Sequence, residues 1–137
     1  MDKTSVHLVD ANVLIRFLTM DDISKAERCE ALFRRAGRGE LKLLVTDVCM
    51  AETVWTLGSF YGVPREEVAD KVIAIVNTPG FVFSDRDILL DAATRFRENN
   101  VDYIDAYHAA FAAAQKQSIY SYDRDFDRFA DIDRLEP

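Results

Sequence analysis

Hydrophobic residues open the chain in a strand-like run and then change to helical spacing. Val6, Leu8 and Val9 form a short apolar run that ends at Asp10. Segment 13–18 then repeats apolar residues at the spacing of one helix face. This pattern predicts a buried first strand that delivers the carboxylate of Asp10 to its C-terminal end, where a helix begins. Ligands of open α/β sheets bind outside the carboxyl ends of the strands, so Asp10 is a candidate functional residue.

The alternation of strand-like and helical patterns continues along the chain. Further helices are expected over residues 24–36, 48–60, 64–77, 85–99 and 103–117, with a helical turn at 125–129. Further strands are expected at 41–46, 81–83, 118–122 and 134–136. Ser24 and Glu27 have the spacing of a capping box at the start of a helix. This order predicts a single α/β domain over residues 1–137, with a parallel-dominated central sheet and helices on both faces.

Composition limits the classes of function that the chain can serve. Its formal net charge of −7 argues against a protein that binds nucleic acid through a bulk positive field. It does not argue against one whose acidic residues are neutralised by metal ions. No apolar run approaches the roughly 20 residues that span a bilayer, and MDKTSV is not followed by a signal-peptide core, so we expect a cytoplasmic protein. Cys29 and Cys49 lack CxxC spacing and are expected to be reduced thiols.

Several acidic residues stand at positions that packing alone explains poorly. Glu52 lies among apolar residues in VCMAETVW, where burial of an unpaired carboxylate is costly. It is either a functional acid or one whose carboxylate reaches solvent or an arginine. Asp105 lies among core-like residues near the start of an alanine-rich helix, one turn after Asp102, whose position the helix dipole also explains. Asp123 follows the end of a predicted strand, as Asp10 does.

Acidic side chains at strand ends and helix starts can meet in a single pocket. The acids expected in this pocket are Asp10, Glu52, Asp105 and Asp123. Carboxylate oxygens are hard ligands that favour Mg²⁺ or Mn²⁺ over Zn²⁺. Carboxylates at close range cannot all stay ionised without cations. The sequence therefore predicts a divalent metal centre, in which Asp125 competes with Asp123 as the fourth ligand unless it only caps the short helix that follows.

Four segments resemble, in order, the motifs of the PIN-domain family, and specifically those of the VapC-type toxin ribonucleases. The segments are VDANVLIRFL, with its acid at Asp10; MAETVW, with Glu52; VDYIDAYHAA, with Asp105 and the accessory Asp102; and SYDRDF, with Ser121, Asp123 and Asp125. The resemblance extends from about Val6 to Phe129. It departs at Ala11, where many relatives carry a threonine, so a hydroxyl is lost beside the first acid.

The resemblance implies a PIN-like three-layer α/β/α fold and an endonuclease that hydrolyses RNA phosphodiesters with Mg²⁺ or Mn²⁺. Asp10, Glu52 and Asp105 would be the principal metal ligands, and Asp123 would bind a second ion or orient water. Supporting roles fall to Asn12 and Ser121, which would orient the ligands, and to Arg16, a candidate RNA contact. As the toxin of a VapBC-type toxin–antitoxin pair, the protein would have a small antitoxin partner, and we also expect a homodimer.

Two other functions remain open at this point. A haloacid-dehalogenase-like phosphatase also places an aspartate after the first strand, but it needs a second acid two residues later, where this chain has Asn12. A non-catalytic PIN-like interaction module would retain the pocket without activity, although no candidate acid is missing here. A metal-dependent nuclease assay with a matched Asp10→Asn variant separates these functions.

Overall fold

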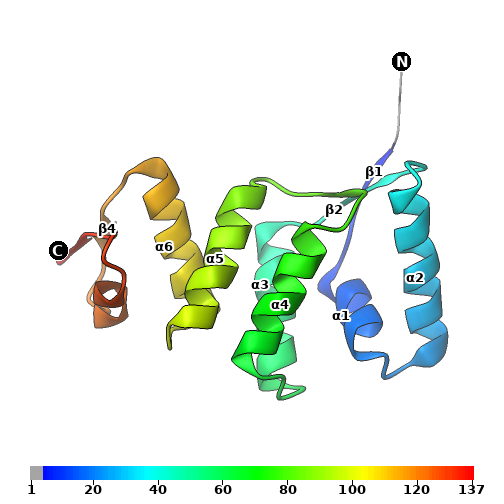
Figure 1. The fold of residues 1–137 in the computed structure, drawn as a ribbon, viewed down its shortest axis with the longest axis horizontal. Helices are drawn as coiled ribbons and strands as arrows, with labels where there is room; N and C mark the ends of the chain where they lie inside the picture. Colours follow the sequence, from blue (N-terminus) through cyan, green and yellow to red (C-terminus); the bar gives the residue numbers. More distant parts are fainter. Residues whose placement is uncertain (1–4) are drawn as a thin grey trace.

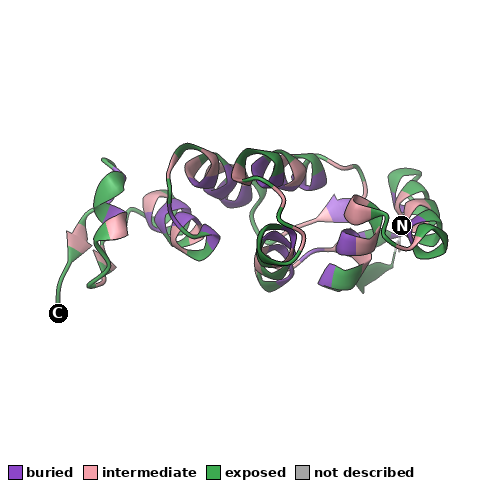
Figure 2. Ribbon diagram, turned by 90° about the horizontal axis from the view of Figure 1, so that it is seen from below, coloured by how far each residue is buried: buried purple, intermediate pink, exposed green. Residues whose placement is uncertain are grey.

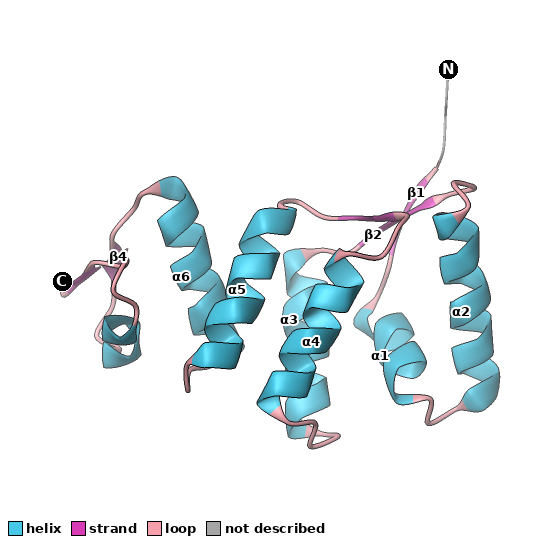
Figure 3. Cartoon of the chain, viewed as in Figure 1, coloured by secondary structure: helices cyan, strands magenta, loops and turns pink. Residues whose placement is uncertain are grey.

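The structure, a computed structural model, describes residues 5–137 (Figures 1 and 3). Its elements alternate between strands and helices along the chain. They are β1 (Val6–Leu8), α1 (Ala11–Thr19), α2 (Ile23–Gly37), β2 (Lys42–Leu44), α3 (Asp47–Ser59), α4 (Arg65–Val76), β3 (Phe81–Val82), α5 (Arg86–Glu98), α6 (Tyr103–Gln115), β4 (Ile119–Tyr120), the 3₁₀ helix η1 (Arg124–Arg128) and β5 (Arg134–Leu135). Every helix and strand expected from the sequence is therefore present, with shorter strands than expected. In residues 5–137, no helix is both long and apolar enough to cross a membrane.

All strand pairs are parallel, as the alternating pattern predicts. Strands β1, β2 and β3 form one sheet in that order, with Val6 opposite Lys42 and Leu43 opposite Phe81. Strands β4 and β5 form a separate two-stranded parallel sheet. Figure 3 shows β4 near one end of the long axis and β1 and β2 toward the other end, with α5 and α6 between them. The α/β class and the parallel pairing are confirmed, and the strands are divided between two sheets.

The helices bury one side each against a continuous apolar core. Figure 2 shows buried positions along one side of the helices and exposed positions along the other. The largest fully buried side chains include Leu14, Leu43, Met50, Leu57 and Leu89. Helix α5 packs against both α4 and α6. Small buried residues lie in α5 and α6, which suits close approach of the two helices: Ala92, Ala93, Ala106, Ala109 and Ala110.

Arg65 joins three segments of this helical layer. Its Nη1 donates to the carbonyl oxygens of Phe96, at 3.1 Å, and of Val101, at 2.7 Å. Its guanidinium lies 4.2 Å from the centre of the Phe96 ring, a cation–π contact. The start of α4 is thus bound to the end of α5 and to the residues that lead into α6.

Two sequence expectations about local structure are wrong. The cap of α2 is Asp22, whose side chain accepts from the Lys25 N–H at 3.0 Å, because the helix starts at Ile23 and includes Ser24. Strand β1 is not buried as expected: Val6 is 55% and Leu8 is 69% exposed. The reason is that β1 lies at the edge of its sheet, and among residues 5–137 no strand covers its outer side.

We expect Gly80→Ala to destabilise the fold strongly. Gly80 has a φ of +89°, and a Cβ at this position would lie 2.4 Å from the Ala36 carbonyl oxygen. Left-handed backbone costs a residue with a Cβ about 1–2 kcal/mol, and overpacking adds a similar amount, so the loss should be roughly 3 kcal/mol or more. Urea unfolding measures it.

Gly62→Ala is the matched control, because Gly62 has a φ of +65° with open space around its Cβ position. It should lose only the backbone contribution, about 1–2 kcal/mol. Equal losses for both variants would contradict close packing of β3 against α2.

Candidate metal centre

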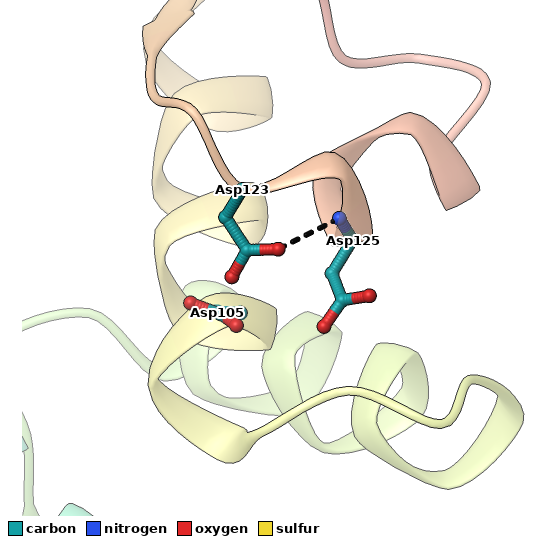
Figure 4. A group of neighbouring side chains, drawn as sticks. All are labelled: Asp105, Asp123 and Asp125. Atoms are coloured by element: carbon teal, nitrogen blue, oxygen red, sulfur yellow. Dashed lines mark hydrogen bonds between the residues drawn. The ribbon is translucent and has the colours of Figure 1, made fainter.

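Three carboxylates converge where α6, β4 and η1 meet. Asp105 lies in the first turn of α6, Asp123 follows β4, and Asp125 lies in the first turn of η1. One ligand oxygen from each lies within 4.8 Å of the others, and Figure 4 shows the three side chains directed toward one another. Asp105 and Asp125 are partly buried and Asp123 is exposed. The two candidates for the fourth ligand, Asp123 and Asp125, therefore both belong to this group.

Local hydrogen bonds set the conformation of the chain that carries Asp123. The Asp123 N–H donates to Oγ of Ser121 at 2.9 Å. Oδ1 of Asp123 accepts from the Asp125 N–H, also at 2.9 Å, which caps η1 (Figure 4). The turn thus orients both carboxylates toward α6. Ser121 contributes to this turn through its hydroxyl, and its expected role in orienting metal ligands stays a prediction.

The electrostatics of the group favour a bound cation. Burial raises the pKa of Asp105, and the negative charges of Asp123, Asp102 and Asp125 raise it further. Arg128 is the basic partner of Asp125, at 3.5 Å, and this pair is largely exposed. The oxygen-only donor set and the mutual repulsion both fit a hard divalent ion such as Mg²⁺ or Mn²⁺. Asp105, Asp123 and Asp125 are the residues that could hold it.

Asp10 and Glu52 lie outside this group: Asp10 lies between β1 and α1, and Glu52 lies in α3. Both side chains are exposed, and the negative charge of each raises the pKa of the Cys49 thiol in the first turn of α3. Burial raises the pKa of the Cys49 thiol to about 11, and the charges of Asp10 and Glu52 contribute to the increase. Both carboxylates are thus near Cys49. The structure therefore brings Asp105, Asp123 and Asp125 together and leaves the carboxylates of Asp10 and Glu52 outside that group.

The remaining predicted site residues have identifiable contacts. Nδ2 of Asn12 lies 3.5 Å from Oδ2 of Asp10, at the limit of a hydrogen bond. Arg16 pairs with Asp21 at 3.1 Å, and Asp21 also accepts from the Tyr61 hydroxyl at 2.7 Å. Arg16 therefore helps to join the end of α1 to the end of α3. Its expected contact with RNA stays a prediction.

One contact near the centre was not predicted from the sequence. The Tyr107 hydroxyl of α6 donates to Oδ2 of Asp47 in α3, at 2.6 Å. Burial and this bond raise the pKa of Tyr107 to about 12. The bond fixes α3, which carries Glu52, relative to α6, which carries Asp105. The two partners are 60 positions apart, and no local pattern marks the pair.

A comparison with known families identifies the chain. The model of the PIN domain family matches residues 7–132. The chain belongs to the PIN-domain family. PIN domains are generally metal-dependent nucleases, so membership indicates nuclease-type chemistry, and the acidic group is suited to a divalent metal. No curated protein matches the chain.

We expect Asp105→Asn to stabilise this PIN domain at neutral pH when a chelator is present. A raised pKa means that the folded state binds the proton more tightly, so the stabilising contribution is present below the unfolded pKa and is lost as pH rises through the folded pKa. Asparagine carries no charge at any pH. The variant should melt a few degrees above wild type at pH 7, and the difference should shrink as pH falls toward about 4.

Asp127→Asn is the control with the opposite sign. The hydrogen bond from Arg134, at 3.0 Å, lowers the pKa of Asp127. A lowered pKa contributes stability above the unfolded pKa, which is lost as pH falls through the folded pKa. Asp127→Asn should therefore melt below wild type at pH 7. If Asp105→Asn behaved in the same way, Asp105 would be a structural acid.

Proposed function

We propose that this PIN domain is a metal-dependent endoribonuclease that hydrolyses RNA phosphodiesters with Mg²⁺ or Mn²⁺. The observation that supports it most directly is the convergence of Asp105, Asp123 and Asp125 in a chain of this family. In the proposal, Asp10 and Glu52 complete the ligand set. A net charge of −7 gives the protein no general attraction for RNA, so a bound cation would be needed to accept the phosphate.

Each side chain has a defined part in this proposal. Asp105, Asp10 and Glu52 would be the principal ligands of a divalent ion, which would supply an activated water and neutralise charge that develops on the phosphate. Asp123, orientated by Ser121, would hold a second ion or position the water. Asn12, within 3.5 Å of Asp10, orients that carboxylate.

We further propose that the protein is a VapC-type toxin of the cytoplasm, controlled by a small antitoxin. The four motifs of the chain support this proposal. An apolar groove of about 300 Å³, lined in part by Leu14, Phe17, Phe33 and Phe81, offers a docking place for a helical segment of such a partner. Phe33 packs edge-on against Phe17 and Phe81, at 5.0 and 5.1 Å between ring centres, so Phe17 is the more accessible anchor.

Charge-removing substitutions should rank the ligands by their effect on RNA cleavage. Asp10→Asn, Asp105→Asn and Glu52→Gln should each reduce activity by at least about 100-fold, because each removes a ligand charge with little change in volume. Asp127→Asn should retain nearly full activity, because Asp127 pairs with Arg134 away from the centre. The measurement is cleavage of a labelled RNA with Mg²⁺ or Mn²⁺ present.

Chelation with EDTA should abolish cleavage, and either ion should restore it. Activity in excess chelator would contradict the metal mechanism. Metal-dependent release of phosphate from a monoester, with RNA left intact, would instead favour the phosphatase. A protein that binds the metal and cleaves neither substrate would be the interaction module.

Metal should also raise the melting temperature of the wild type. An ion that binds only the folded state stabilises it by about 2.7 kcal/mol at a hundredfold excess over its dissociation constant. Asp105→Asn should show a smaller increase than wild type, and Asp127→Asn an equal one. A wild type without any response to either ion would contradict the proposed ligand set.

A further inference from the structure

The outer edge of β1 is an unpaired parallel strand edge. On the inner side, the Lys42 N–H donates to the Ser5 carbonyl at 2.8 Å, and the Val9 N–H donates to the Leu44 carbonyl at 3.0 Å. Successive residues of a parallel strand bond to opposite sides, so the backbone groups of Val6 and Leu8 point outward. Within residues 5–137 no strand pairs with them. An exposed apolar edge of this kind is a template for another strand.

Strand β4 has the complementary free edge. The Ile119 and Ser121 N–H groups donate to the carbonyls of Asp133 and Leu135, both at 2.9 Å, on the β5 side. The backbone groups of Tyr120 therefore point to the opposite side, where the described part of the chain supplies no strand. Tyr120 is also 70% exposed. Both free edges thus combine open backbone groups with exposed apolar side chains.

The chain's own packing keeps these two edges apart. Helix α5 is packed between α4 and α6, and Arg65 binds the start of α4 to the residues that lead into α6. Tyr107 and Asp47 join α6 to α3. Figure 1 shows β4 and β1 on opposite sides of this helical layer. In this arrangement of the helices, β4 therefore lies apart from β1 of the same chain.

We propose that β4 of a second copy of this chain pairs in parallel with β1, so that the metal centre is assembled from two chains. The inference rests on the proposed nuclease function. Asp10 follows β1 and Asp123 follows β4, and parallel pairing brings the carboxyl ends of the two strands together. The Asp105 group of one copy would then meet Asp10 and Glu52 of the other. A two-fold axis forms both pairings at once, so each dimer has two centres and leaves neither edge open.

Disulfide trapping tests the strand pairing without any nuclease assay. In a parallel pair, a residue whose backbone bonds across the pair lies opposite one whose backbone bonds away from it, so Tyr120 faces His7 when Asp10 and Asp123 are level. His7→Cys combined with Tyr120→Cys therefore places two thiols opposite each other on the same face of the sheet. Under mild oxidation we expect a covalent dimer, seen as a band of twice the 15.6 kDa chain mass on a non-reducing gel. Light scattering of the wild type should also give twice the chain mass. Ile23→Cys with Tyr120→Cys is the control, since Ile23 is exposed on α2 away from the edge, and it should stay monomeric.

Each other outcome of this trapping experiment overturns the inference. A disulfide within one chain would mean that the copy closes on itself. A monomeric wild type that forms no crosslink would mean that the edges remain open. Both results leave the nuclease proposal standing, provided that the wild type cleaves RNA.

Mixed chains test whether the centre is shared. Asp10→Asn and Asp105→Asn are each inactive alone in this proposal. In a co-expressed mixed dimer, one centre carries both substitutions and the other carries neither, so about half of the wild-type activity should return. A mixed dimer without activity, beside an active wild type, would overturn the shared centre. An inactive wild type that still gives the covalent dimer would overturn the nuclease proposal and retain the assembly.

Discussion

Strand β1 has backbone hydrogen-bonding groups on two sides, and the described chain pairs only one of them. Burial of Val6 and Leu8 depends on a strand at the open side, and so does the position of Asp10 relative to the other acids. An unpaired backbone group costs free energy once water is excluded, so the edge is either solvated or paired. In the proposed dimer this constraint connects the fold to the site, because the strand that closes the edge brings its own carboxylates to Asp10.

Repulsion among carboxylates is the second physical constraint on the candidate metal centre. Asp105 is partly buried beside Asp123 and Asp125, and its pKa is raised first by that burial and then by the neighbouring negative charges. The chain accepts this repulsion where a cation would remove it. Asp127, in contrast, is neutralised by Arg134 within the fold. The difference between these two aspartates separates an acid arranged for a ligand from one arranged for stability.

Local sequence patterns predicted most of the elements. They also marked Asp105 and Asp123, which lie close together with Asp125 in the structure. The long-range arrangement was not predictable, because periodicity shows that residues 6–9 favour a strand but does not show which strand lies beside it. The hydrogen bond between Tyr107 and Asp47 was not predicted for the same reason, because it joins residues far apart in the sequence. The cap at Asp22 was missed because Ser24 is also a good cap, and only the observed start of the helix at Ile23 decides between them.

In the proposed dimer, Asp10 and Asp105, which lie apart in one chain, bind the same metal ion. Binding of Mn²⁺, followed by the electron paramagnetic resonance signal of the free ion, tests this shared site directly at concentrations where the protein is dimeric. We expect Asp10→Asn and Asp105→Asn each to weaken Mn²⁺ binding by tenfold or more, and Asp127→Asn to leave it unchanged. An Asp10→Asn protein that binds Mn²⁺ as tightly as wild type, beside a weakened Asp105→Asn protein, would contradict the shared site.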